Sequence, residues 1–178
     1  MWKVDKLCVT LLLAGASGAY AAGDVCQPVF EAQAKMMVTP THIYHTETAA
    51  FRNNQTRNGE MIYTGGETGA IYVMVDGKWH RSTLTVAGML KQEAENRAET
   101  QTTCQYVREE VVDGEAAQVY SGHSANDTDK VVFTVWISKR RGLPLKQDID
   151  MDVGGAMGKS HRSLRYEYTN VRPPAGVQ

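Results

Sequence analysis

The sequence predicts an α+β fold, in which one strongly curved antiparallel sheet forms a half-open barrel and two helices cover its concave face. Strand-like runs separate two segments of helical periodicity, and five further runs joined by short turns follow the second. The chain nowhere alternates as β-α-β, so a parallel sheet is not expected. The stretch 143–153 (LPLKQDIDMDV) also alternates apolar and polar residues, which is typical of a strand with one buried and one solvated face.

The N-terminal residues 1–21 have the features of a secretory signal peptide. Lys3 and Lys6 precede the apolar run 7–13, and the segment ends in an A-x-A site at 19–21. The apolar run is far shorter than the roughly 20 residues that cross a bilayer, and no later segment is apolar enough to do so. We therefore expect cleavage after Ala21 or Ala22, a periplasmic location, and one domain over residues 22–178.

The charge of the remaining chain argues against two classes of partner. Removing residues 1–21 takes away two lysines and one aspartate, which leaves a net charge near −2. A weakly acidic domain is not expected to bind nucleic acid or to be attracted generally to anionic membranes.

Two cysteines, Cys26 and Cys104, remain after cleavage. In an oxidising compartment the simplest interpretation is one disulfide between them. A thiol redox centre and a metal site are the alternatives, but neither cysteine lies in a C-x-x-C pair or has a histidine at ligand spacing.

The first predicted helix begins near Cys26, with Asp24 as its N-cap and Pro28 in its first turn, and Thr39-Pro40 ends it. A strand is expected over 41–51. The next residues, 52–60 (RNNQTRNGE), are so polar that they predict a loop, followed by a short strand at 61–64.

Two Asp-Gly pairs, at 76–77 and 113–114, predict two-residue hairpin turns, because both positions of a type I′ turn need positive φ. Between the hairpins, Thr85 is expected to cap a second helix that runs to about Glu99. The remaining predicted strands are 104–112, 115–123, 131–138, 143–153 and 160–171.

Two motifs in the last third of the chain resemble a known family. They are VWISKRRGLPLKQDI at 135–149 and the closing RYEYTNV at 165–171. With the signal peptide and the order of elements, they resemble the periplasmic lipoprotein-carrier group of the LolA/LolB type, over about residues 24–171. The resemblance implies an incomplete barrel, apolar inside, that can take up acyl chains, and some relatives in that superfamily are sensors that bind proteins. The chain departs from the dedicated carriers in its cysteine pair, its short first helix and its polar segment 52–59.

The expected inner face of strand 143–153 carries Leu143, Leu145, Ile149 and Met151, and only Gln147 interrupts it. For strand 131–138 alternation leaves the inward face open, since both faces are apolar. The residues that we expect to line a hydrophobic cleft are Met36, Met74, Leu90, Trp136, Leu145, Ile149, Met151, Leu164, Tyr166 and Tyr168. The alternative is an ordinary solid core packed against the two helices.

Catalytic and metal-binding patterns are not found in the sequence. His42 and His45 form H-x-x-H, but on a strand they face opposite sides and cannot share a metal. The cluster Lys139, Arg140 and Arg141 is read as a solubilised hairpin tip rather than a site for an anion. We expect no catalytic residue, no metal and no cofactor.

These features together predict a non-enzymatic periplasmic binding protein. It would hold a lipid or other hydrophobic ligand, which could be the acyl chains of a lipoprotein, between the sheet and the helices. The alternative is a protein-interaction or sensor module with a filled core, which would bind an envelope protein through a sheet edge or the segment 52–59.

Overall fold

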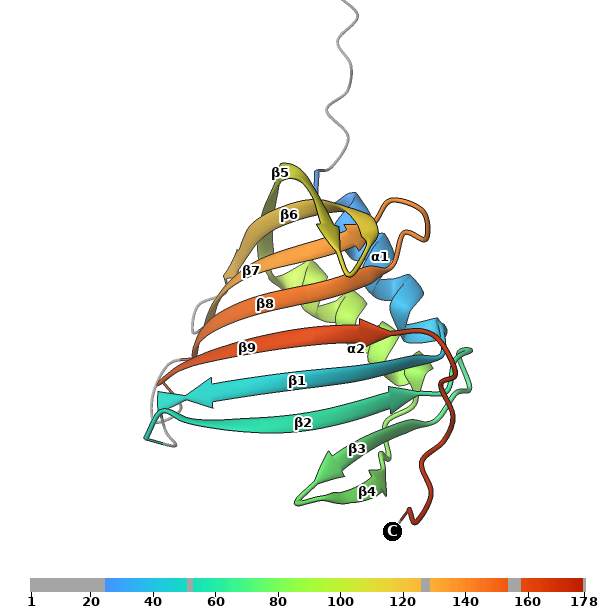
Figure 1. Cartoon of the computed structure of the whole chain (residues 1–178). Coiled ribbons are helices and arrows are strands. Elements are labelled where there is room, and N and C mark those ends of the chain that lie inside the picture. The colour runs from blue at the N-terminus through green and yellow to red at the C-terminus, as the bar shows by residue number, and fades with distance from the viewer. Residues whose placement is uncertain (1–24, 51–52, 126–128, 154–157, 178) are drawn as a thin grey trace, which may run out of the picture.

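A single antiparallel sheet curls around two helices in the structure, which is a computed structural model (Figure 1). It describes residues 25–50, 53–125, 129–153 and 158–177. The described residues form α1 (Gln27–Val38), β1 (Thr41–Ala49), β2 (Gln55–Tyr63), β3 (Ile71–Val75), β4 (Lys78–Arg81), α2 (Val86–Glu99), β5 (Gln101–Val112), β6 (Glu115–Ala125), β7 (Asp129–Ser138), β8 (Pro144–Val153) and β9 (Gly158–Glu167). The predicted signal peptide lies outside them.

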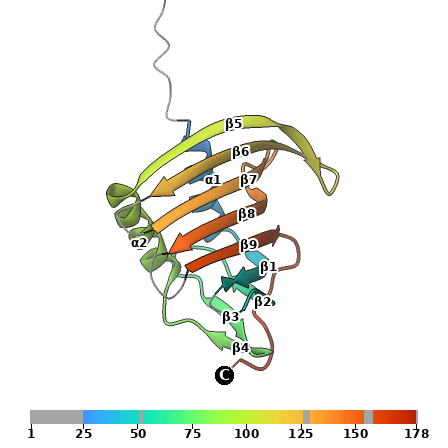
Figure 2. The same cartoon turned by 90° about the vertical axis from the view of Figure 1, so that its left-hand side faces the viewer.

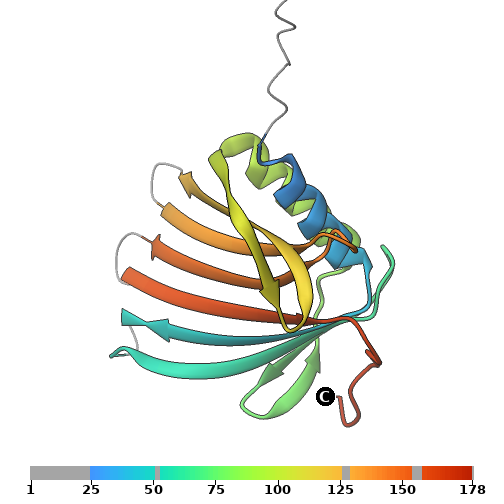
Figure 3. The same ribbon diagram turned by 45° about the horizontal axis from the view of Figure 1, so that its top comes forward.

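The order of strands across the sheet is β4-β3-β2-β1-β9-β8-β7-β6-β5. The first and last strands of the chain, β1 and β9, therefore pair at its centre. Both helices lie side by side against the concave side (Figures 1 and 3). The predicted α+β half-barrel is confirmed.

Helix α1 begins at Gln27, with Cys26 in the N-cap position and no side-chain cap. The predicted cap Asp24 lies outside the described residues, and a helix that begins at Gln27 does not place it at the N-cap. Pro28 occupies the first turn as predicted, because the missing N–H of proline removes no helical hydrogen bond there.

The prediction of a loop over 52–60 is wrong for residues 55–60, because β2 begins at Gln55 and pairs with β1 along its full length, while residues 53–54 form the turn before it. The first half of β2 is exposed, while Ile62 and Tyr63 at its other end are buried. A strand that is wet on both faces needs no apolar residues, so this half has no alternation for the sequence to reveal.

The two predicted Asp-Gly hairpins are confirmed. Asp76 and Gly77 have φ of 49° and 76°, and Asp113 and Gly114 have φ of 49° and 81°. These are the left-handed conformations that a two-residue turn between twisted strands requires. The predicted cap of α2 is also confirmed, since Thr85 accepts a hydrogen bond from the backbone N–H of Gly88.

The core between the concave face and the helices consists of two adjoining clusters. The larger joins residues of α1 and α2, such as Met36 and Val86, to the sheet residues Ile43, Leu164 and Tyr166. The smaller packs Ala32 of α1 against Tyr120, Phe133, Val135 and Ile137. The inward face of β7 is therefore the one that carries Phe133, Val135 and Ile137.

A third cluster lies on the outer, convex face of the sheet. It joins Ala117 and Val119 of β6 to Trp136 of β7 and Leu145 of β8, with Val112 of β5 packed against them. The tip of the β5–β6 hairpin arches over this face (Figures 1 and 2), where Asp113 forms a 3.0 Å ion pair with Arg165 of β9. Trp136 and Leu145 are thus covered by a part of the same chain.

The expected inward position of Leu145 is wrong because of a bulge in β8. Ile137 pairs with Pro144 while Trp136 pairs with Lys146, so Leu145 is an extra residue in the ladder. One extra residue reverses the alternation, which turns Leu145 outward while Ile149 stays inward.

The charged turn at 139–142 holds the β5–β6 hairpin close to its tip through Glu115, the first residue of β6. The carboxylate of Glu115 accepts hydrogen bonds from Arg141 at 3.0 and 2.6 Å and one from the hydroxyl of Ser138. Lys139 likewise pairs with Glu109 at 2.6 Å. Arg141 and Lys139 thus pair with acidic side chains of the β5–β6 hairpin. The turn therefore holds the hairpin in place as well as contributing to solubility.

Replacement of Glu115 by glutamine is expected to lower the free energy of unfolding by about 1–2 kcal/mol at pH 7. The hydrogen bonds from Arg141, and then from Ser138, hold the pKa of Glu115 below its usual value of 4.5. A lowered pKa in the folded state means that the stabilisation is present above the unfolded pKa and is lost as the pH falls through the folded one. Urea denaturation at pH 7 and pH 3 measures this, and a difference between E115Q and wild type that stays constant with pH would contradict it.

Candidate functional site

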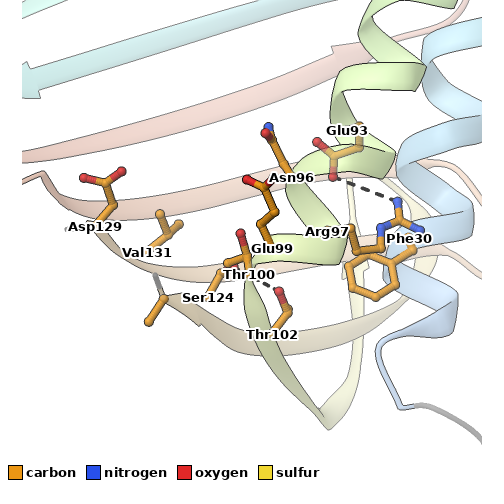
Figure 4. Close-up of a pocket in the computed structure, with 11 residues that line it drawn as sticks. Phe30, Glu93, Asn96, Arg97, Glu99, Thr100, Thr102, Ser124, Asp129 and Val131 are labelled. Carbon is orange, nitrogen blue, oxygen red and sulfur yellow. Dashed lines mark hydrogen bonds and ion pairs between the residues drawn. The ribbon is translucent and has the colours of Figure 1, made fainter. Parts of the chain in front are cut away.

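A pocket of about 730 Å³ opens where the C-terminal end of α2 passes the ends of β5, β6 and β7 (Figure 4). Such a volume lies within the usual range for small-molecule sites, about 300–1,000 Å³. The helices contribute Phe30 of α1 and Glu93, Asn96, Arg97 and Glu99 of α2. The sheet side contributes Thr100, Thr102, Ser124, Ala125, Asp129 and Val131.

Helix α2 is held weakly on the side that faces this pocket. Of the residues of α2, all of which the structure describes, only Val86 at the first position is buried. Met89 and Leu90 are half-buried. Toward the pocket the helix contacts α1 through the Arg97 guanidinium, which stacks 4.0 Å from the centroid of the Phe30 ring. A helix with so little buried surface can separate from the sheet at low cost.

Apolar side chains continue from the pocket along the inner face of the sheet. Val131 lines the pocket, and alternation places Phe133 next to it on the same face of β7. Met151 of β8 pairs with Val131, and Ile149 pairs with Phe133. Of these four, Phe133 is buried and the other three are half-buried.

A polar group lies further along the inner face, on β1 and β9. The guanidinium of Arg162 donates a 2.7 Å hydrogen bond to Glu47, and His45 lies on the same face. Burial, and then the charge of Arg162, lower the pKa of His45 below its ordinary value of 6.5. The imidazole ring covers Gly59 of β2, where a Cβ atom would come within 2.3 Å of it.

Seven of the ten residues predicted to line the cleft lie in or against the cluster on the concave side or continue its face. Met36, Leu164 and Tyr166 are buried within it, and Leu90, Ile149 and Tyr168 pack against it. Met151 follows Ile149 on the same face. Burial raises the pKa of both Tyr166 and Tyr168.

The other three predicted lining residues do not face the helices. Trp136 and Leu145 belong to the outer cluster, and Met74 alternates with the inward Ile71 and Val73 of β3. Met74 pairs with Trp79 on the outer side of the β3–β4 hairpin. The apolar character of these three residues predicts burial, but it does not distinguish the faces of a sheet that carries an apolar cluster on each side.

The polar residue Gln147, which interrupts the apolar face of β8, has a structural explanation. Its side chain accepts a 2.8 Å hydrogen bond from the Tyr166 hydroxyl. A buried phenol needs such a partner, so a glutamine at this inward position supports the core.

Sequence reasoning missed the residues that line the pocket itself. Phe30 lies off the apolar stripe of the first helix, while Arg97 and Glu99 look like solvated helix residues. The contact of Arg97 with Phe30 depends on how the two helices pack, so no local pattern could have identified it.

The histidines form no metal site within the part of the chain that the structure describes. His42 and His45 face opposite sides of β1, as predicted, and His42 contacts Glu60 at 2.8 Å on the outer face. His161 has a carboxylate partner that its sequence spacing does not suggest, Asp150 on the neighbouring strand at 2.8 Å.

The predicted disulfide between Cys26 and Cys104 is present, with a Cα–Cα distance of 5.1 Å. It ties the start of α1 to β5, at the opposite edge of the sheet from β4. None of the helices in the described ranges has the length and apolarity to traverse a bilayer.

The architecture is the incomplete barrel that the resemblance of the sequence implied: two helices lie on the concave side of one curved antiparallel sheet. Solved structures that are similar to it include the lipoprotein LppX of Mycobacterium tuberculosis, with 12% identity, a TM-score of 0.46, and coverage of 83% of this chain and 97% of LppX. MucB, solved in complex with the periplasmic part of MucA, gives 14% identity, a TM-score of 0.47, and coverage of 86% of this chain but 61% of MucB.

A LolA-superfamily protein of Nitrosomonas europaea gives 10% identity and a TM-score of 0.26, with coverage of 76% of this chain and 89% of that protein. No family model matches the sequence. No curated protein matches it either. Similarities at these levels of identity and TM-score assign no activity to the chain.

Proposed function

We propose that this chain is a non-enzymatic binding protein of the bacterial periplasm. After export through the signal peptide 1–21, residues 22–178 would form one lipoprotein-carrier-like domain. The domain holds the apolar part of a lipid or similar amphiphile between the concave face of the sheet and the two helices.

The observation that carries this proposal is the pocket at the end of α2, because it adjoins apolar side chains that are only half-buried. Val131, Ile149 and Met151 keep exposed apolar surface on the inner face, although two helices stand over that face. Burial of this surface by an acyl chain would contribute about 0.8 kcal/mol for each CH₂ group. Of the predicted lining residues, Leu90, Ile149 and Met151 would contact the ligand directly. The others on the concave side would support the cleft from the core: Met36, Leu164, Tyr166 and Tyr168.

The weak packing of α2 supports a route for the ligand. The disulfide fixes the start of α1 to β5, so α1 is not the element that moves. The C-terminal half of α2 contacts α1 through the exposed Arg97 and the half-buried Phe30, and it can move away when an acyl chain enters.

A second candidate function, protein binding, is favoured by β5, which among the described strands is an edge strand that pairs with β6 alone. Tyr106, Val107 and Val111 of this edge strand expose 49%, 43% and 68% of their surface. An extended segment of an envelope protein could add to the edge as a further strand. This alternative predicts a polypeptide that is purified without ligand and forms a stoichiometric protein complex.

The decisive experiment is native mass spectrometry of protein exported to an oxidising compartment and purified without detergent, with solvent extraction of the same sample. A stoichiometric amphiphile in the extract supports the binding function and identifies the ligand. A bare polypeptide mass, together with no uptake of an apolar dye, would overturn it in favour of protein binding.

Replacement of Val131 by tryptophan is expected to weaken the binding of the apolar dye N-phenylnaphthylamine about tenfold, because the indole would fill the apolar wall of the pocket. The matched control is Val132→Trp, one residue along the same strand, where the side chain is 54% exposed on the outer face. Fluorescence titration measures both, with circular dichroism to confirm folding. Equal dye affinity in V131W and wild type, or an equal loss in V132W, would contradict the assignment of the cleft.

A further inference from the structure

The chemistry of the pocket at the end of α2 restricts which amphiphile it can accept. Among the described residues that line it, Arg97 is the one basic side chain, whereas Glu93, Glu99 and Asp129 are acidic. The guanidinium of Arg97 already lies over the Phe30 ring and 3.9 Å from Glu93. Little positive charge is therefore left to bind an anion.

The backbone adds to this negative character. Helix α2 ends at Glu99, with Thr100 as its C-cap, and both residues line the pocket. The last carbonyl groups of a helix have no partner within the helix and carry a partial negative charge. Carboxylates and helix carbonyls are hydrogen-bond acceptors, so the end of α2 presents acceptors from two sources.

Uncharged polar groups line the sheet side of the same pocket (Figure 4). Thr102 of β5 and Ser124 of β6 hydrogen-bond to each other at 2.9 Å. Val131 lies close by on β7 and begins the apolar inner face. The arrangement is a polar mouth, rich in acceptors, that leads to an apolar interior.

We propose that this mouth binds the head group of the amphiphile, and that the head group is rich in N–H or O–H donors and carries no negative charge. The inference rests on the proposed binding function and gives its ligand class. An ammonium or a sugar head would donate to the carboxylates of Glu93 and Glu99 and to the end of α2. A carboxylate or phosphate head would be repelled by the same groups.

The test compares three amphiphiles with the same twelve-carbon chain as competitors of the bound dye: dodecylammonium, dodecyl glucoside and dodecanoate, each below its micelle concentration. Wild-type protein with its disulfide intact is expected to bind the ammonium and glucoside forms about tenfold more tightly than dodecanoate. In the double variant E93Q/E99Q this preference is expected to fall to about twofold.

The matched control is E31Q/E95Q, which removes the same net charge at exposed sites on α1 and α2 outside the pocket. It should keep the tenfold preference. Loss of the preference in this control as well would assign it to the charge of the whole protein and overturn the inference.

The failures of the two proposals can be told apart. If all three amphiphiles displace the dye equally well, the binding function stands and the assignment of the head group is wrong. If neither the dye nor any amphiphile binds, the binding function itself fails and the inference fails with it.

Discussion

Replacement of both Cys26 and Cys104 by serine is expected to lower the free energy of unfolding by about 4 kcal/mol. The two cysteines are 78 residues apart in sequence, so the bridge closes a long loop in the unfolded chain. In the chain-entropy account, a loop of this length makes the unfolded state less favourable by about that amount. Urea denaturation of the oxidised wild type and the C26S/C104S variant measures the difference.

Reduced wild-type protein is the control for this measurement, because reduction breaks the same bridge without changing the side chains beyond the sulfur atoms. It should unfold at nearly the same urea concentration as C26S/C104S. A double variant as stable as oxidised wild type would mean that the bridge adds no net stability, which would contradict its proposed role in holding α1 against β5.

Replacement of Ile43 by alanine is expected to lower the free energy of unfolding by about 3 kcal/mol. Ile43 is 2% exposed and lies on the inner face of β1, within the cluster that joins the sheet to both helices. Removing its outer carbon atoms loses buried apolar surface and leaves a cavity in the central strand pair of the sheet. Thermal and urea unfolding of I43A give the change in free energy.

The matched control is Thr46→Ala on the same strand, where the side chain is exposed. A change within about 0.5 kcal/mol is expected there. A small loss in I43A, similar to that in T46A, would show that the centre of the sheet is loosely packed. The loosely packed region of the inner face would then extend from the pocket at the end of α2 to β1.

Local chemistry allowed several elements to be predicted from the sequence. The Asp-Gly pairs at 76–77 and 113–114 set their turns because both positions adopt positive φ. Thr85 marks the start of α2 because its hydroxyl caps the helix. In each case the residues that determine the structure are within a few positions of one another in the chain.

Two of the sequence-based predictions are wrong because the structure there depends on contacts between distant residues. Residues 55–60 form a strand although their composition is that of a loop, because β1 provides their hydrogen-bond partners along its whole length. Trp136 lies on the outer face of β7, and the bulge in β8 turns Leu145 to the same side, where both pack against residues of the β5–β6 hairpin. Both outcomes depend on contacts between distant parts of the chain.

The candidate site shows the same division. Apolar alternation placed Ile149 and Met151 on the inner face, which the register of β8 preserves beyond its bulge. The polar mouth of the pocket could not be predicted from the sequence. Its residues Phe30, Glu99 and Asp129 come from three elements, and only the packing of the two helices on the sheet brings them together.

The sequence by itself determined the class of fold, the turns, the helix cap and the pair of cysteines, because these depend on backbone conformation, periodicity and simple count. Only the tertiary structure decided which apolar face of β7 turns inward and where the helices leave a pocket. Both faces of that strand are apolar, so their burial free energies are similar in the sequence alone. The choice is made by what packs against each face, α1 on one side and the β5–β6 hairpin on the other.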